Sequence, residues 1–263
     1  MFQKNPMTMI GTIDRCWLFT FQSPPEWAEA WLPDILTPVL HNGHAFWNVV
    51  VCHVDRMRPK GFPKWTGVSY WHVAYRLYVN FAPPGETPIE GLYFVRSDCS
   101  RPLMAAMGNI MTDFRFHSAH IRVNTDKDKV AINIDTPGGK GSAWLRRKEA
   151  PALPAYSAFG SLEEAAAYLK YKPYGISVDK RGSANVVAIT RDEAAWHSRL
   201  VPVDDQKWAF FENLPIRPEI CYEVDPIDYQ WNRGKVYAPA TKSVKTIMRE
   251  EPSDLWDRRE RLV

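Results

Sequence analysis

Residues 68–80 read VSYWHVAYRLYVN, and this stretch decides the fold. Aromatic and β-branched residues fill it, which favours a β-strand. Successive side chains of a strand point to opposite faces, and one face here carries Ala74, Arg76, Tyr78 and Asn80. Arg76 lies in mid-strand among aromatic residues, where a solvated charge is not expected. We therefore expect its guanidinium to point into the interior of the protein.

Further strands flank this one along the chain. Residues 45–54 are nearly all apolar, which is typical of a strand that is covered on both faces. Residues on either side of a polar tip at 126–128 alternate between apolar and polar, as in a hairpin. We expect one antiparallel, largely closed sheet made of residues 45–54, 68–80, 92–97, 119–125 and 129–135, with shorter strands at 142–147, 186–190 and 198–203.

Three short helices are expected beside these strands. Capping boxes begin helices at Ser23 and Ser161, and a proline in the first turn begins another after Ser100. Residues 208–213 are expected as a helical turn or a strand, and the charged tail is expected to form a short helix around residues 255–256. The fold class is therefore α+β, mainly antiparallel β, with a barrel-like sheet.

The composition is that of an ordinary globular protein. Of the 263 residues, 45% are apolar and 24% are charged, which excludes disorder, collagen and coiled coils as the class. A chain of this length buries a large core without disulfides. We expect a single domain over residues 1–263, with a C-terminal extension from about residue 204.

Charge and hydropathy restrict the partners. The net charge of +3 comes with only short basic runs, so no nucleic-acid partner is expected. No apolar run is long enough to span a membrane, so we expect no membrane contact. The N-terminus does not have the pattern of a signal peptide.

Metal, redox and cofactor signals are weak. Four cysteines are spread along the chain: Cys16, Cys52, Cys99 and Cys221. We interpret them as buried free thiols, typical of the reducing cytoplasm, and expect a cytoplasmic protein. His-x-x-His sequences begin at His41 and His117, but neither has the context of a metal site, so no metal is expected. The glycine-rich residues 136–142 lack phosphate-loop spacing, and we expect no cofactor.

Several polar residues lie close to Arg76 in the expected strands and the segments that follow them: Tyr78, Glu90, Arg96, Asp98, Arg115 and His117. A buried arginine needs a carboxylate, carbonyl oxygens or an anionic ligand. One interpretation is a structural ion pair of Arg76 with Asp98 or Glu90. The other is an anion clamp, because a planar guanidinium binds a carboxylate through two parallel hydrogen bonds.

A series of short motifs follows one order along the chain. It includes Gly43-His44-Ala45-Phe46-Trp47, Tyr75-Arg76-Leu77-Tyr78-Val79, Gly91-Leu92-Tyr93-Phe94-Val95-Arg96-Ser97-Asp98, Phe114-Arg115-Phe116-His117 and Trp196-His197-Ser198-Arg199-Leu200. Together these motifs resemble the YqjF-like uncharacterised bacterial proteins of the acetoacetate decarboxylase-like superfamily, over about residues 39–203. The resemblance implies a bacterial protein with a cone-shaped closed β-barrel, flanking helices and one interior cavity.

The chain departs from the decarboxylases of that superfamily at the reactive residue. Those enzymes form a Schiff base on a lysine whose pKa a second lysine lowers, within a Gly-Phe-Pro-Lys-Lys signature. The corresponding place here, residues 113–117, contains no lysine. Gly61-Phe62-Pro63-Lys64 looks similar but lies two strands too early, and a strand glutamate common in the YqjF-like group is His72 here. Schiff-base decarboxylation is therefore not expected.

Two functions remain after the loss of the lysine. The first is a non-catalytic domain whose cavity takes a small carboxylate or keto ligand, with the binding residues Arg76, Tyr78, Arg96 and Arg115. The alternative is a lyase or other enzyme that acts on a small organic acid, with His117 as the acid or base. The expected partner is a small organic acid, and a homo-oligomer stays open.

Overall fold

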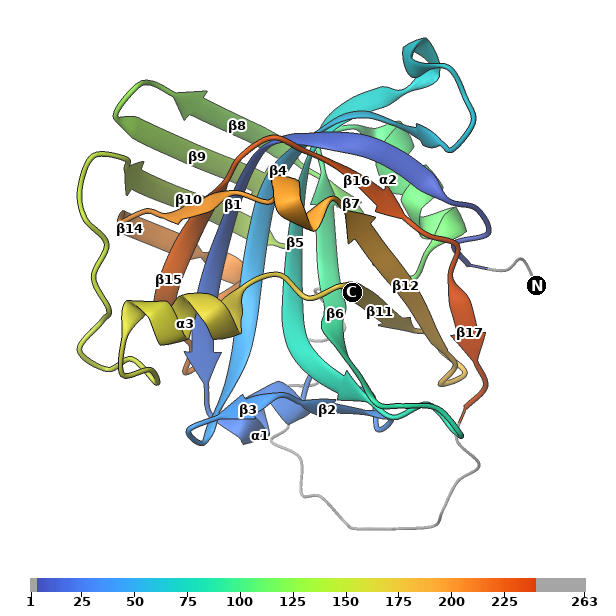
Figure 1. Ribbon diagram of the computed structural model, residues 1–263, viewed down its shortest axis with the longest axis horizontal. Helices are drawn as coiled ribbons and strands as arrows, with labels where there is room; N and C mark the ends of the chain where they lie inside the picture. The colour runs from blue at the N-terminus through green and yellow to red at the C-terminus, as the bar shows by residue number, and fades with distance from the viewer. Residues whose placement is uncertain (1–3, 240–263) are drawn as a thin grey trace.

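A closed barrel of seven strands forms the centre of the protein in the computed structural model, which describes residues 4–239. Its strands are β1 (Met9–Ser23), β4 (His44–Pro59), β5 (Val68–Phe81), β6 (Ile89–Cys99), β11 (Tyr174–Val178), β12 (Ala184–Arg191) and β16 (Ile227–Trp231). Neighbours pair in the order β1-β16-β12-β11-β6-β5-β4, and β4 pairs with β1 to close the ring (Figure 1). All these pairs are antiparallel except β11 with β6, which is parallel.

The long strand β1 was not predicted from the sequence. It pairs with β4 from Ser23 back to Met9, and with β15 (Arg217–Val224) and β16 on its other edge. A strand this long contacts several partners only because the barrel twists around it.

A second sheet of four strands lies beside the barrel. Its order is β14-β10-β9-β8, and its strands are β8 (His120–Thr125), β9 (Lys129–Thr136), β10 (Gly139–Arg146) and β14 (Val203–Trp208). The expectation that residues 119–125 and 129–135 belong to the barrel sheet was therefore wrong. Their strict alternation suits a sheet with one buried face. Ile132 and Leu145 on that face belong to the same buried apolar cluster as Trp17 of β1.

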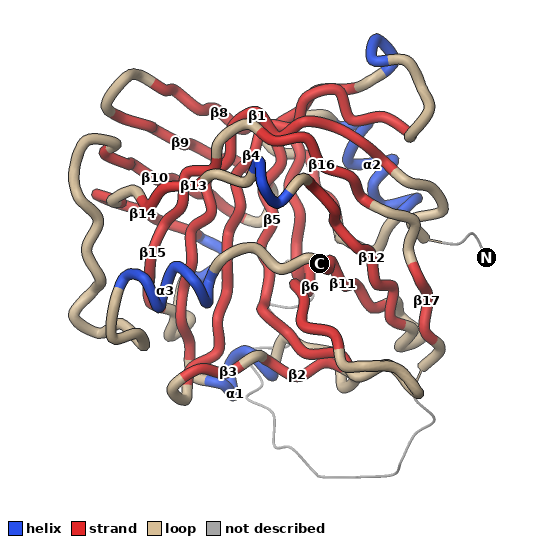
Figure 2. The backbone as a smooth tube through the Cα atoms, in the orientation of Figure 1, coloured by secondary structure: helices blue, strands red, loops and turns tan. Residues whose placement is uncertain are grey.

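Helices are few: they are α1 (Pro25–Glu29), α2 (Pro102–Met111) and α3 (Leu162–Leu169). In the view of Figure 2, α3 lies across β15 and β1. The capping box of α3 is confirmed, since Ser161 accepts a hydrogen bond from the Glu164 amide at 3.1 Å. The predicted cap at Ser23 was wrong: this residue ends β1, and its hydroxyl accepts a hydrogen bond from Trp47 Nε1.

Short elements complete the chain. They are the strands β2 (Leu36–Pro38), β3 (Leu40–His41), β7 (Phe116–Ser118), β13 (Ser198–Leu200) and β17 (Lys235–Tyr237), and 3-10 turns at Lys64–Thr66, Glu193–Ala195 and Ala209–Phe211. The expected strand at 198–203 is thus divided between β13 and β14. Residues beyond 204, expected as an extension, supply the barrel strand β16. The helix expected around residues 255–256 lies outside the described residues.

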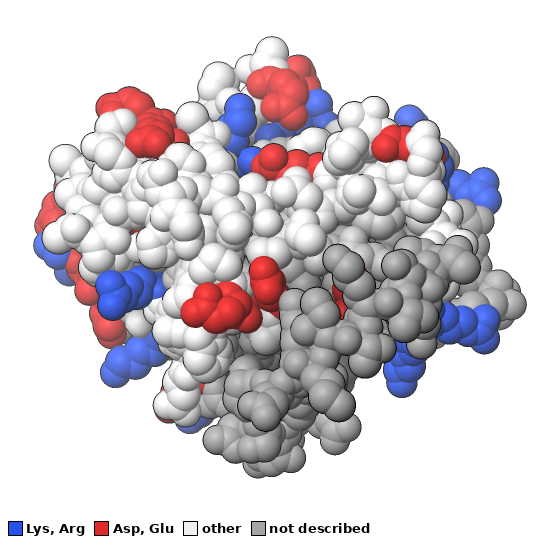
Figure 3. Space-filling view, turned by 90° about the horizontal axis from the view of Figure 1, so that it is seen from below, with Lys and Arg blue, Asp and Glu red and all other residues white. Residues whose placement is uncertain are grey.

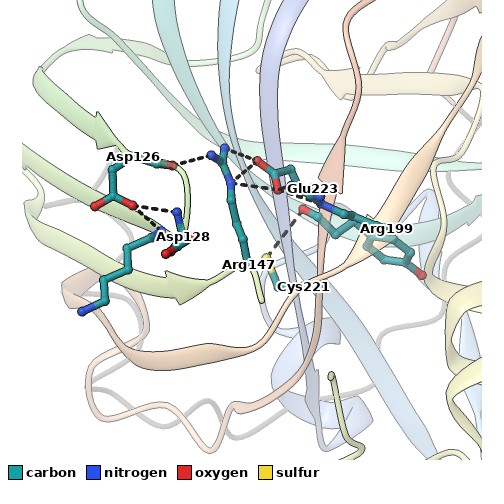
Figure 4. A network of polar contacts seen from close by, with 8 residues as sticks. Asp126, Asp128, Arg147, Arg199, Cys221 and Glu223 are labelled. Carbon is teal, nitrogen blue, oxygen red and sulfur yellow. Dashed lines mark hydrogen bonds and ion pairs between the residues drawn. The ribbon is translucent and has the colours of Figure 1, made fainter. Parts of the chain in front are cut away.

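A polar network ties the connector after β10 to the edge of the larger sheet (Figure 4). Arg147 Nε and Arg199 Nη2 donate to the Glu223 carboxylate at 3.0 and 2.6 Å. Burial would raise the pKa of Glu223, but the hydrogen bonds from both arginines outweigh it and hold this pKa below its ordinary value. The network is structural, because each charge is already satisfied.

The surface offers no dominant charge on the face that Figure 3 shows. Basic and acidic side chains lie there in small groups around a broad uncharged area, apart from the residues drawn in grey. Within residues 4–239, no helix is long and apolar enough to cross a membrane.

Candidate functional site

The barrel encloses a cavity of about 80 Å³. Its walls come from β1, β4, β5, β6, β12, β15 and β16, with Tyr171 and Trp196 at one side. The volume is about half that of an engineered protein cavity of roughly 150 Å³ that binds benzene. The cavity therefore has room for a molecule of a few heavy atoms.

Arg76 is the buried charge in this cavity. It is 7% exposed, and its Nε donates to Asn48 Oδ1 at 2.7 Å. Its Cζ lies 5.5 Å from the ring centre of Phe94, its cross-strand neighbour. No carboxylate of residues 4–239 forms an ion pair with it. Burial lowers the pKa of Arg76. An isolated buried charge costs several kcal/mol, and among residues 4–239 the Nη groups of Arg76 make no hydrogen bond that offsets this cost.

Arg191 is a second cationic group on the cavity wall, and sequence reasoning missed it. Its Cζ lies 3.5 Å from the ring centre of Tyr171 and 3.4 Å from that of Trp196, and its Nε donates to Glu193. Arg191 also lines an outer groove that carries Arg56, Arg58 and Lys64. Arg191 is thus placed between the basic groove and the interior. The sequence around Arg191 gives little sign that this residue lines a cavity, because only the fold brings Tyr171 and Trp196 to its two sides.

The other polar groups of the cavity are neutral at ordinary pH. Burial, and then the charge of Arg76, lowers the pKa of His72 to about 3. Burial raises the pKa of Cys16 to about 12 and that of Cys52 well above its ordinary value. The thiols therefore stay protonated and are poor nucleophiles. Charge in the cavity comes from the two arginines.

The residues expected to share the cavity with Arg76 are not on its wall. Tyr78 faces the interior but donates its hydroxyl to the Leu169 carbonyl of α3 at 2.7 Å. Arg115 has a φ of 55° and donates to the Tyr93 hydroxyl at 3.2 Å. His117 Nδ1 lies 4.0 Å from Asp98 Oδ1, and burial lowers the pKa of His117.

Arg96 lies on the opposite face of β6 from Phe94. The register shifts between Tyr75 and Arg76, so that Tyr75 pairs with Arg96 while Arg76 pairs with Phe94. Val95 is the extra residue of this β-bulge. In an unbroken strand, residues 94 and 96 would share a face; the bulge turns Arg96 outward.

The carboxylates that Arg76 was expected to pair with are taken by other cations. Arg96 Nε donates to Asp98 Oδ1 at 3.0 Å, and Arg96 Nη2 donates to the Thr136 hydroxyl at 2.9 Å. Glu90 pairs with Lys172 at the surface. The interpretation of Arg76 as half of an ion pair with Asp98 or Glu90 was therefore wrong, because these carboxylates are occupied on other faces.

The closed mixed barrel has the fold of acetoacetate decarboxylase-like structures. Residues 12–215 match DUF2071, a family described as an uncharacterized conserved protein, and the chain belongs to this YqjF-like family. None of the curated proteins matches the chain.

Solved structures share the fold at low identity. An acetoacetate decarboxylase-like enzyme from Sphingomonas wittichii RW1 is 9% identical, with a TM-score of 0.60 over 89% of this chain and 94% of that one. The enduracididine biosynthesis enzyme MppR is 8% identical, with a TM-score of 0.62 over 92% and 90%. The acetoacetate decarboxylase of Legionella pneumophila is 14% identical, with a TM-score of 0.57 over 87% of each chain.

Proposed function

We propose that the protein binds a small carboxylate or keto acid in the barrel cavity, with Arg76 holding the carboxylate. The observation that carries the proposal is the buried guanidinium of Arg76, which keeps only the Asn48 hydrogen bond among residues 4–239. A carboxylate would accept two parallel hydrogen bonds from the free Nη groups and would neutralise the charge. The cavity volume suits a ligand of the size of pyruvate.

A structural neighbour supports this class of ligand. MppR has been solved in complex with pyruvate, at a TM-score of 0.54 and 10% identity to this chain. Pyruvate has the charge and the size that the cavity of the present protein would accept.

We further propose that this binding does not lead to Schiff-base decarboxylation. None of the described residues that line the cavity is a lysine. The titratable groups beside the arginines include protonated thiols and the neutral imidazole of His72. The described cavity wall therefore holds no activated amine that could attack a keto group. An acid or base role of His117 in this cavity has no geometric support, because His117 is not among the lining residues.

A titration of pyruvate into the full chain by calorimetry tests the proposal. We expect wild type to bind, and Arg76→Met to lose at least tenfold in affinity while a thermal melt stays cooperative. Arg122→Met is the matched control, because Arg122 is exposed on β8 in the second sheet. Equal binding by wild type and Arg76→Met would refute the role of Arg76.

A further inference from the structure

A second cavity, of about 110 Å³, lies between α2 and the barrel. Six of the eight methionines of the chain line it: Met7, Met9, Met57, Met104, Met107 and Met111. The rest of the wall is mostly aromatic, with Phe114 and Phe116 from the segment after α2. Methionine side chains are flexible and polarizable, and adapt to apolar ligands of varied shape. The proposed carboxylate site makes no use of this cavity.

The two cavities share a wall. His72, Tyr229 and Trp231 line both of them. His72 comes from β5 and lies four residues before Arg76, on the same face of the strand. Tyr229 and Trp231 come from β16. An apolar group attached to a ligand at Arg76 therefore needs to pass only these side chains to reach the methionines.

His72 is a neutral side chain of the shared wall. It is 9% exposed, and its Nε2 is buried without a hydrogen-bond partner among the described residues. The low pKa of His72 keeps the imidazole neutral, so the wall carries no charge that would repel an apolar chain.

We propose that the two cavities form one site for a carboxylic acid with an apolar chain. The carboxylate lies at Arg76, and the chain passes His72 into the methionine-lined cavity. The inference rests on the proposed carboxylate site and adds the class of ligand. A methylene group takes about as much room as a water molecule, roughly 30 Å³, so the second cavity accommodates about four carbon atoms. Unbranched acids of about six to eight carbons fit the combined space.

Chain length is the variable that tests this inference. Calorimetric titrations of butanoate, hexanoate and octanoate into the full chain give Kd for each acid. One buried methylene contributes about 0.8 kcal/mol, which is about fourfold in Kd. We expect octanoate to bind on the order of 100-fold more tightly than butanoate to wild type. Equal Kd values for the three acids would overturn the inference and leave the carboxylate site standing.

A pair of variants tests where the alkyl chain of the ligand lies. Met104→Trp fills the second cavity, and we expect it to bind butanoate as wild type does but to lose the gain with chain length. Leu103→Trp is the matched control on the preceding residue of α2, because Leu103 is 71% exposed and does not line the cavity. Butanoate binding reports that the barrel of each variant is folded. If Met104→Trp does not fold, Met111→Phe takes its place.

The remaining outcomes separate the two proposals. If butanoate and pyruvate both fail to bind to wild type, the carboxylate site is refuted and the chain-length inference falls with it. If octanoate binds equally well to wild type and Arg76→Met, the methionine cavity takes apolar molecules without a carboxylate anchor. That result would overturn the single combined site.

Discussion

Arg76 and Asn48 lie directly opposite each other on β5 and β4, and the Nε of Arg76 donates to the Asn48 amide oxygen at 2.7 Å. This bond fixes one edge of the guanidinium, and the proposed ligand would contact the other edge. The neutral amide orients the charge without cancelling it. A carboxylate at residue 48 would have cancelled the charge that the proposed ligand needs.

Asn48→Asp tests this relationship. The new carboxylate would pair with Arg76 and compete with the ligand, so we expect pyruvate to bind at least tenfold more weakly, with no loss in Tm. Calorimetry and a thermal melt measure both effects. Asn48→Leu is the companion variant: it leaves Nε unsatisfied and should destabilise the fold by about 1–3 kcal/mol. Unchanged pyruvate affinity in Asn48→Asp would contradict the anion site.

Borohydride trapping tests for Schiff-base chemistry. We expect no covalent adduct after incubation with acetoacetate and reduction, because no lysine occupies residues 113–117 and none of the described cavity-lining residues is a lysine. Intact mass spectrometry followed by peptide mapping checks this. The acetoacetate decarboxylase of Legionella pneumophila serves as the positive control for the trapping conditions. A mass increase on any lysine, Lys64 included, would show that the reactive residue had been misplaced.

Glu223→Gln should destabilise the protein in a pH-dependent way. The folded-state pKa of Glu223 lies below its unfolded value, so its ionised form adds stability above the unfolded pKa, and this stability is lost as the pH falls through the folded pKa. At pH 7 we expect a loss of about 1–3 kcal/mol in the free energy of unfolding, since two charge-assisted contacts are weakened. Urea denaturation of both proteins at pH 7 and at pH 3 measures the difference, which should shrink at the lower pH.

Gly138→Ala should destabilise the turn that Arg96 reaches. A Cβ at residue 138 would overlap the Arg96 guanidinium, which the buried pair with Asp98 holds in place. Overpacking of this kind costs about 1–3 kcal/mol. Gly160→Ala is the control, because its Cβ would make only an ordinary contact with Glu164. Equal urea midpoints for the two variants would mean that the Arg96 side chain moves away from the new Cβ without loss of stability.

The sequence by itself determined the elements whose signals are local. The alternation and the aromatic content of residues 68–80 predicted β5, and the charge among them predicted that Arg76 faces the interior. Ser161 and Glu164 predicted the start of α3, because a capping box joins residues three positions apart. The ordered motifs, through the family resemblance, predicted the closed barrel. Each of these features depends on neighbours in the chain or on a known family.

Tertiary structure alone decided which residues meet in the cavity. The bulge at Val95 turns Arg96 away from Arg76, and a one-residue shift of register is not visible in a propensity or an alternation. β1 has weak alternation in its first half and becomes a strand through pairing with β4 and β16. Arg191 reaches the cavity only because β12 and β16 are neighbours. Such long-range pairings depend on the packing of the whole barrel, which local sequence patterns do not encode.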